Sequence, residues 1–312
     1  MGFLISIVQG NSRYQREVIM HLSPLRYPGG KNRIANFIAQ VCVDNRISGL
    51  YVEPYAGGAS VALFLLFSNV VKRIVINDKD RSIYAFWYSV LHHTDKLCQM
   101  ILETEINVEN WHKQKKVQGR KKNANLLELG FSTLFLNRTN RSGIISGGII
   151  GGVEQKGEYK IDCRFNKENL INRIRQIAQR KKHISVYNLD AISLIHKIEQ
   201  QASKDLNNAL IYFDPPYYKK GSCLYLNHYI KSDHKDVADA ISVLNYKWVV
   251  SYDNVPEIHE LYDQFRNIEY SLKHTAHSAR DGGEVLFFHH EIIIPNRYQN
   301  PIEYKDFDNY IL

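Results

Sequence analysis

Short apolar stretches that run into an acidic residue recur in this chain, and they strongly restrict its fold. Arg73 to Asn77 leads to Asp78, His183 to Asn188 leads to Asp190, and Ala209 to Phe213 leads to Asp214. Strand candidates that alternate with helical stretches in this way predict an open α/β sheet. The carboxyl ends of such strands form the edge where ligands bind, so we expect the three acids to share that edge.

The remaining elements extend this alternation. Later in the chain we expect helices from Ala191 to about Gln200 and near His234 to Leu244, a strand from Lys247 to Tyr252, and closing strands at 284–288 and from Glu291 to Ile294.

A turn with two glycines follows the strand candidate Leu50 to Val52. It reads Glu53-Pro54-Tyr55-Ala56-Gly57-Gly58 and leads into an apolar helix from Val61. A strand, a glycine turn and a helix together let the backbone approach a nucleotide-type cofactor. Asp78, about 20 residues beyond the glycines, suits the two hydroxyls of a ribose, or alternatively the N-cap of a helix.

The strand candidate that ends at Phe213 continues as Asp214-Pro215-Pro216-Tyr217. The two prolines stiffen this turn. The Asp214 carboxylate and the Pro215 carbonyl can accept both hydrogens of an exocyclic amine, and Tyr217 can stack on the ring that carries it. The motif predicts a clamp for a flat, amino-bearing base, with a rigid strand-ending turn and an exposed Asp as the alternative.

A second glycine turn, Arg26-Tyr27-Pro28-Gly29-Gly30-Lys31, precedes an amphipathic helix. Gly29 and Gly30 permit close approach of the backbone, and Lys31 offers a cation for a carboxylate. The alternative is a helix-entry turn with a surface lysine.

The positive charge of the chain is concentrated in its middle third. Residues 96–187 carry 18 Lys and Arg against 8 Asp and Glu, a net charge of +10, whereas the rest carries 22 against 24. A basic segment with interleaved aromatic residues is typical of a surface for a polyanion, nucleic acid first. A solvated basic surface without a partner is the alternative. The lysines expected to contact phosphates are Lys115, Lys116, Lys121 and Lys122.

Other classes of protein are disfavoured. No apolar run is long enough to span a bilayer and the N-terminus has no signal-peptide pattern, so we expect a cytoplasmic protein. The four cysteines are scattered and the histidines show no metal-ligand spacing, so neither a disulfide framework nor a metal site is expected.

Five motifs occur in the order found in the Dam-like, alpha-group (D12 class) DNA adenine-N6 methyltransferases, which the chain resembles from Leu25 to Phe288. They are the segments 26–31, 53–58, 77–78, 135–138 and 214–217. The resemblance implies a Rossmann-like, S-adenosylmethionine-dependent methyltransferase sheet with an inserted, mostly helical target-recognition domain. Residues 1–95 are then the cofactor-binding part of the catalytic domain, 96–187 the basic target-recognition insert, and 188–312 the catalytic part that completes the sheet.

The resemblance also implies roles for single residues. S-adenosylmethionine is the expected cofactor, S-adenosylhomocysteine its product, and no metal is required. The residues expected around the cofactor are Tyr27, Gly29, Gly30, Lys31, Glu53, Pro54, Tyr55, Gly57, Asp78, Asp190 and Asp214. The catalytic clamp is expected to be Asp214, Pro215, Pro216 and Tyr217. The DNA contacts expected beside the lysines are Asn137, Arg138, Asn140 and Arg141.

The implied reaction is direct transfer of a methyl group to N6 of an adenine in double-stranded DNA. The base must leave the duplex, and we expect it to stack on Tyr217 or Tyr218. After Arg138 the chain departs from the pattern of relatives that read GATC, so the target sequence stays open. Arg138 and Arg141 suit base edges or phosphates equally well.

Two alternatives to this function remain, an N4-cytosine methyltransferase and a catalytically inactive DNA-binding relative. The resemblance also suggests a cognate restriction endonuclease as a partner in a restriction-modification pair, and a monomeric enzyme.

Overall fold

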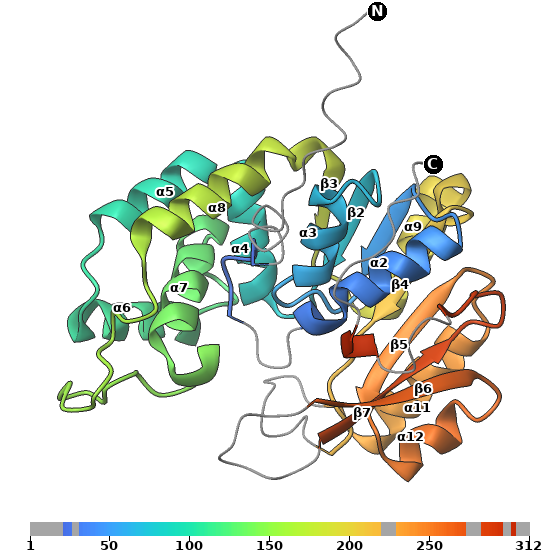
Figure 1. Ribbon diagram of the computed structural model, residues 1–312. Coiled ribbons are helices and arrows are strands. Elements are labelled where there is room, and N and C mark those ends of the chain that lie inside the picture. Colours follow the sequence, from blue (N-terminus) through green and yellow to red (C-terminus); the bar gives the residue numbers. More distant parts are fainter. Residues whose placement is uncertain (1–20, 27–30, 220–228, 273–281, 296–300, 304–312) are drawn as a thin grey trace, which may run out of the picture.

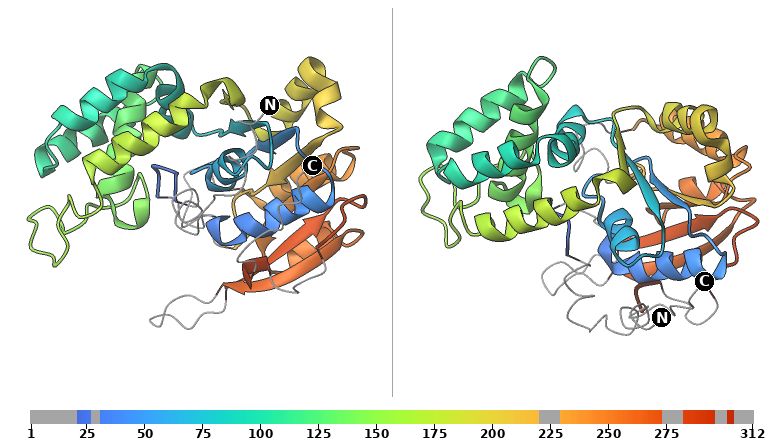
Figure 2. Two further views of the ribbon diagram at one scale, coloured as in Figure 1. Left: turned by 45° about the horizontal axis from the view of Figure 1, so that its top comes forward. Right: turned by 90° about the horizontal axis from the view of Figure 1, so that it is seen from above.

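The structure is a computed structural model that describes residues 21–26, 31–219, 229–272, 282–295 and 301–303. A sheet with helices on its faces forms the larger part, and a group of helices lies beside it (Figure 1). The views in Figure 2 show the same arrangement from two other directions.

Within the described residues the sheet has seven strands in the order β3-β2-β1-β4-β5-β7-β6. Neighbours from β3 to β5 run parallel, whereas β7 is antiparallel to both β5 and β6. The strands are β1 (Leu50–Glu53), β2 (Arg73–Asn77), β3 (Ile184–Tyr187), β4 (Ala209–Phe213), β5 (Trp248–Asp253), β6 (Arg266–Leu272) and β7 (Gly282–Phe288).

Helices cover both faces of this sheet, which explains why its central strands are continuously apolar. In β1, Tyr51 packs with the helices of one face, whereas Leu50 and Val52 pack with those of the other. The first face carries α2 (Ala35–Asp44) and α3 (Ser60–Phe67), preceded by the short helix η1 (Lys31–Ile34). The second face carries α9 (Ala191–Leu206), α11 (Lys231–Ser242) and α12 (Pro256–Leu261).

The helices beside the sheet are α4 (Arg81–His92), α5 (Thr94–Glu103), α6 (Val108–Gly119), α7 (Leu126–Thr139) and α8 (Lys167–Gln179). Short 3-10 helices complete the described elements: η2 (Arg141–Gly143), η3 (Lys181–His183) and η4 (Pro301–Glu303). Helix α4 packs extensively on α7, yet the indole of Trp87 on α4 donates to the Gly57 carbonyl at 2.9 Å. Thus α4 joins the sheet to the predicted insert, whose boundaries at 96 and 187 stay a prediction.

The predicted α/β fold is confirmed, with two differences near the C-terminus. The prediction of a strand from Glu291 to Ile294 is wrong, because this segment has no regular structure. The side chain of Asn45 holds it in place: it donates to the Ile293 carbonyl and accepts from the Ile293 amide, both at 2.8 Å. Strand β6 takes the place beside β7 and was not predicted. No helix of the described part of the chain is long and apolar enough to cross a membrane.

Candidate active site

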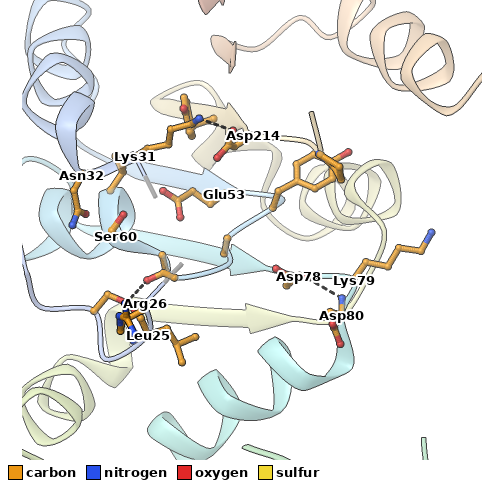
Figure 3. Close-up of a pocket in the computed structure, with 18 of the residues that line it drawn as sticks. Leu25, Arg26, Lys31, Asn32, Glu53, Ser60, Asp78, Lys79, Asp80 and Asp214 are labelled. Carbon is orange, nitrogen blue, oxygen red and sulfur yellow. Dashed lines mark hydrogen bonds and ion pairs between the residues drawn. The ribbon is translucent and has the colours of Figure 1, made fainter. Parts of the chain in front are cut away.

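A cavity of about 460 Å³ lies at the carboxyl edge of the sheet, beside the ends of β1, β2 and β4 (Figure 3). This volume falls within the roughly 300–1,000 Å³ of small-molecule sites. The strand order reverses between β1 and β4, and open α/β sheets bind ligands at such a point. The acidic side chains on its described walls are Glu53, Asp78, Asp80 and Asp214.

The carboxylate of Asp214, directly after β4, is held from two sides. The Ser251 hydroxyl donates to Oδ1 at 2.8 Å, and Lys31 Nζ lies 3.3 Å from the same oxygen. Among the described residues both contacts use Oδ1, which leaves Oδ2 for a ligand. Burial raises the pKa of Asp214 although Lys31 opposes the shift, so this carboxylate is a stronger base than an exposed one.

The ammonium of Lys31 lies between two carboxylates. Its Nζ is 3.1 Å from Glu284 Oε2, and it also contacts the hydroxyl of Tyr217. Burial alone disfavours the charge, but the acidic groups around it, Asp214 first, hold the pKa of Lys31 well above its usual value. Lys31 is therefore a permanent cation at the edge of the cavity. The sequence suggested that Lys31 would pair with a carboxylate, and in the structure its partners are the carboxylates of Asp214 and Glu284.

Sequence reasoning missed Glu284, although it predicted the strand that carries it. This residue on β7 is 4% exposed and accepts hydrogen bonds from Tyr217 and, at 2.5 Å, from Tyr270. The only signal in the sequence is an acid at the start of an otherwise apolar strand, Val285 to Phe288, whose side chains are all buried.

The predicted clamp residues after Asp214 differ in position. Pro216 lines the cavity, whereas the ring of Tyr217 is 7% exposed and packs against Lys31, whose Nζ is 4.8 Å from the ring centre. Pro215 is buried. The Tyr218 amide donates to Asp253 at 2.8 Å, which anchors the loop beyond the clamp. Stacking of a base on Tyr217 or Tyr218 stays a prediction. In this structure the hydroxyl of Tyr217 contacts Lys31 and Glu284.

Glu53 ends β1 and faces the N-terminus of α3. Its Oε1 accepts from the Ala62 amide at 3.0 Å and from the Tyr51 hydroxyl at 3.1 Å. Burial raises the pKa of Glu53 to about 8. The turn that follows has positive φ at Gly57 (46°) and Ala59 (48°), so the backbone bends tightly around the cavity.

Asp78 directly follows β2 and accepts two backbone hydrogen bonds, from Gly57 at 3.1 Å and from Asp80 at 2.8 Å. Burial raises the pKa of Asp78 to about 7. Of the remaining cofactor candidates, Tyr55 lines the cavity and its hydroxyl bonds that of Tyr229 at 3.0 Å, while the Pro54 carbonyl accepts from Asn77 at 2.9 Å.

Three of the predicted cofactor residues that the structure describes, Pro54, Gly57 and Asp190, do not line the cavity. Asp190 caps α9 by accepting from the Ser193 amide at 3.0 Å and does not belong to the cavity wall. Tyr27, Gly29 and Gly30 lie outside the described residues.

Residues 27–276 match the model of a protein family, the D12 class N6 adenine-specific DNA methyltransferases. The chain belongs to this family. It is similar to the type II methyltransferase M.MjaIII of Methanocaldococcus jannaschii, with 24% identity over 238 residues that cover 70% of this chain and 76% of the relative. It is also similar to the type II methyltransferase M.CviBI of Paramecium bursaria Chlorella virus NC1A, with 22% identity over 283 residues that cover 87% and 98%.

The predicted enzyme class is thereby confirmed: this is an adenine-N6 DNA methyltransferase that uses an S-adenosylmethionine-type methyl donor and acts on DNA. The family is N6 adenine-specific, which favours adenine over the alternative of an N4-cytosine methyltransferase. No comparison tests the absence of a metal from the reaction or the roles of single residues, which stay predictions.

Three of the residues that we expected to contact DNA have internal partners in the methyltransferase. The amide of Asn137 bonds Arg26 N, Arg26 O and the Gly143 carbonyl at 2.7–2.8 Å. Asn140 accepts from Trp111 at 2.7 Å and donates to two backbone carbonyls. The guanidinium of Arg138 donates to the Pro24 carbonyl. Asn137 and Asn140 are fully buried, so their geometry favours a structural role over a contact with DNA.

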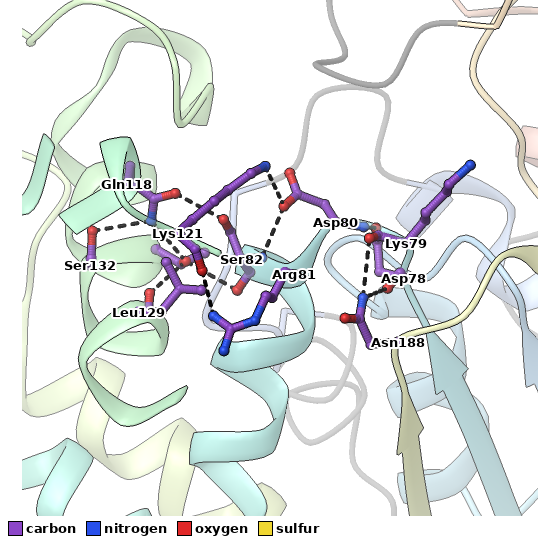
Figure 4. A network of polar contacts seen from close by, with 11 residues as sticks. Asp78, Lys79, Asp80, Arg81, Ser82, Gln118, Lys121, Leu129, Ser132 and Asn188 are labelled. Carbon is purple, nitrogen blue, oxygen red and sulfur yellow. Dashed lines mark hydrogen bonds and ion pairs between the residues drawn. The ribbon is translucent and has the colours of Figure 1, made fainter. Parts of the chain in front are cut away.

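The predicted lysines also differ in their surroundings. Lys116 and Lys122 are exposed, as is Arg141. Lys115 donates to the Ser146 carbonyl at 3.2 Å, and Lys121 Nζ lies 3.1 Å from Asp80 Oδ1 at the cavity wall (Figure 4).

Sequence reasoning overlooked two arginines that line the cavity together with Arg138. These are Arg26 and Arg173, the latter on α8, which donates to the Ser23 carbonyl at 3.1 Å. Figure 3 shows Arg26 on the other side of Glu53 from Lys31. Burial, followed by repulsion from Arg173 and Arg26, lowers the pKa of Arg138 to about 10. Among the described residues none of the three has a carboxylate within salt-bridge distance, so this end of the cavity is positively charged.

Proposed function

We propose that one cavity of this methyltransferase brings the two reactants together. Asp214, with the Pro215 carbonyl, binds the amine of the target adenine, and Asp78 binds the ribose of S-adenosylmethionine. The observation that carries this proposal is that Asp78 and Asp214 line one cavity at the point where the strand order reverses.

The residues around Asp78 fit such a donor. Each oxygen of Asp78 accepts one backbone hydrogen bond and keeps a further lone pair for a hydroxyl. The tight turn at Gly57 lets backbone groups approach a ligand closely. When bound, the donor supplies an electrophilic methyl group on a cationic sulfonium, and the carboxylates of Glu53, Asp78 and Asp214 make the cavity favourable for a cation.

Asp214 then orients and activates the amine. A carboxylate and a carbonyl that accept both N–H groups keep the nitrogen lone pair directed at the methyl group. As the C–N bond forms and the S–C bond breaks, positive charge develops on N6. The preorganised Asp214 carboxylate stabilises this charge and accepts one N6 proton, which leaves a neutral methylated amine.

DNA is proposed to lie over the positively charged end of the cavity and the exposed lysines of the helical group. Three arginines of the cavity, Arg26, Arg138 and Arg173, have no carboxylate partner in the described part of the chain and suit the phosphates beside a base that has left the duplex. Both relatives are named type II methyltransferases, and we extend that class to this chain as part of the proposal. A cognate restriction endonuclease, a monomeric state and a cytoplasmic location stay predictions.

The test is methylation of DNA from a methylation-free host that expresses the chain, read by modification-sensitive sequencing. N6-methyladenine at a defined site is expected from the wild type and none from Asp214→Ala. The Asp214→Ala protein should still bind S-adenosylhomocysteine, which controls for folding. Near-normal methylation by a folded Asp214→Ala protein would contradict the role of Asp214, and N4-methylcytosine would contradict the choice of base.

A further inference from the structure

Within the described residues, a cluster at the edge of the cavity contains one cation and two carboxylates. Lys31 Nζ is 3.3 Å from Asp214 Oδ1 and 3.1 Å from Glu284 Oε2. The three side chains come from η1, from the loop after β4 and from β7, so widely separated parts of the chain meet here. A single ion pair would balance the charge of Lys31, and the second carboxylate needs a separate explanation.

The two carboxylates are not equivalent. The Asp214 side chain is 23% exposed and lines the cavity, whereas that of Glu284 is 5% exposed and is absent from the cavity wall. Glu284 is also surrounded by donors, because Lys31, Tyr217 and Tyr270 all direct hydrogens at it. Asp214 is thus the carboxylate that a substrate reaches, whereas Glu284 is held in place by its three donors away from the cavity wall.

The proposed reaction removes the negative charge of Asp214 when the amine proton arrives there. A buried ammonium that loses its only counter-ion is strongly destabilised, which would make this proton transfer unfavourable. With Glu284 in place, Lys31 keeps a partner at 3.1 Å throughout. The negative charge of Glu284 also acts directly on Asp214 and adds to the burial that raises its pKa.

We propose that Glu284 is a positioning residue for methyl transfer: it is the permanent counter-ion of Lys31 and so leaves Asp214 free to accept the amine proton. This inference rests on the proposed role of Asp214. Glu284 itself touches neither the base nor the donor.

The decisive experiment is a double-mutant cycle on single-turnover methyl transfer at saturating donor and DNA, with Glu284→Gln, Lys31→Met and the double variant. We expect Glu284→Gln alone to slow transfer by roughly 10- to 100-fold while the Kd values for S-adenosylmethionine and DNA stay within about threefold. In the Lys31→Met background the same substitution should change the rate by less than about threefold, because no ammonium needs a counter-ion. An equal loss in both backgrounds would overturn the proposal.

The pH profile gives a readout that a purely structural role would not change. Transfer requires ionised Asp214, so activity falls as the pH drops through its pKa. The charged and titratable groups that face Asp214 are Lys31, Glu53, Tyr212, Tyr217, Tyr252 and Glu284, with the Ser251 hydroxyl beside them. Loss of the Glu284 charge favours ionised Asp214. The acid limb of the single-turnover rate should therefore move to lower pH in Glu284→Gln and stay in place in Glu284→Asp. An unmoved limb in Glu284→Gln would count against the inference.

Glu269→Gln is the matched control, since Glu269 is an exposed carboxylate on the adjacent strand β6 and should give wild-type kinetics. If Glu284→Gln does not fold, Tyr270→Phe removes one donor to Glu284 without changing charge. We expect Tyr270→Phe to slow methyl transfer when Lys31 is present and not in the Lys31→Met background. An unchanged rate in Tyr270→Phe alone would overturn the proposal. Active Asp214→Ala would remove the proposed function itself, whereas inactive Asp214→Ala with fully active Glu284→Gln would remove only the present inference.

Discussion

Asp78 shows how one side chain that holds the fold is also positioned for its proposed ligand. One oxygen holds the turn at Gly57 and the other holds the amide of Asp80, where α4 begins. These bonds fix the carboxylate before any ligand arrives, so little conformational entropy is lost on binding. Because burial raises its pKa to about 7, the charge of Asp78 also depends on pH near neutrality.

Replacement of Asp78 should therefore weaken donor binding strongly. For Asp78→Ala we expect S-adenosylmethionine affinity to fall by about 1.5–3 kcal/mol, or roughly 10- to 150-fold, the range for hydrogen bonds to a charged group. Isothermal titration calorimetry measures this directly. Asp239→Ala is the control, because Asp239 is an exposed carboxylate that pairs with Lys235 on α11 and should leave the Kd unchanged. Unchanged affinity in Asp78→Ala would place the ribose elsewhere.

The raised pKa of Asp78 predicts a pH dependence of the same affinity. Hydroxyl donors favour the ionised carboxylate, so binding is tightest above the pKa of about 7 and weakens as the pH falls through it. Between pH 8 and pH 6 the Kd of S-adenosylhomocysteine should rise several-fold in the wild type. Asp78→Asn has no charge to titrate and should bind more weakly with a flatter profile. Equal slopes in the two proteins would refute the assignment to Asp78.

At the scale of elements, the start of α4 joins the sheet to the helical group. Lys121 Nζ lies 3.1 Å from Asp80, and the Ser82 hydroxyl donates to Gln118 on α6 at 2.9 Å (Figure 4). Gln118 donates in turn to Ser132 and Thr133 on α7. The helices that we expect to face DNA are thus bonded to the segment that carries Asp78.

Lys121 and Lys122 are neighbours with different surroundings, and this allows a sharp test. Lys122 is exposed, so Lys122→Ala should flatten the log-log salt dependence of DNA binding by roughly 0.9 if it contacts a phosphate. Lys121 forms an ion pair with Asp80, so Lys121→Ala should leave the salt dependence of DNA binding unchanged. Because the pair is partly exposed, its loss should lower the free energy of unfolding by less than about 1 kcal/mol. The reverse pattern would show that Lys121 leaves Asp80 when DNA binds.

For the whole molecule, α4 makes separate unfolding of the helical group unfavourable. One side of α4 packs on α7, while Trp87 bonds the turn after β1. We expect sheet and helices to unfold in a single calorimetric transition, which S-adenosylhomocysteine at 100 times its Kd should stabilise by about 2.7 kcal/mol. Two transitions, with only one of them shifted by the ligand, would show that residues 96–187 form an independent unit.

The comparison of sequence with structure shows which physical signals are local. The strands before Asp78 and Asp214 were predictable because a buried parallel strand is a continuous apolar run. The error at Ile292 to Ile294 has the same origin, since a short apolar run also suits an irregular segment held by a distant Asn45. The contact between Glu284 and Lys31 and the bonds between Asn137 and Arg26 join residues more than 100 positions apart, which no local pattern encodes.

The order of the strands along the chain means that Glu284, which lies on β7, is synthesised long after Lys31. Lys31 and Glu284 are 253 residues apart, so the ribosome makes the cation near the beginning and its permanent counter-ion only when β7 is synthesised. A nascent chain that has emerged as far as β6 contains Asp78 and Asp214 but not yet Glu284, so only one of the two carboxylates that lie beside Lys31 in the complete protein is present. With the proposed role of Glu284, such a chain lacks the second carboxylate partner of Lys31, and full activity requires β7 to take its place between β5 and β6.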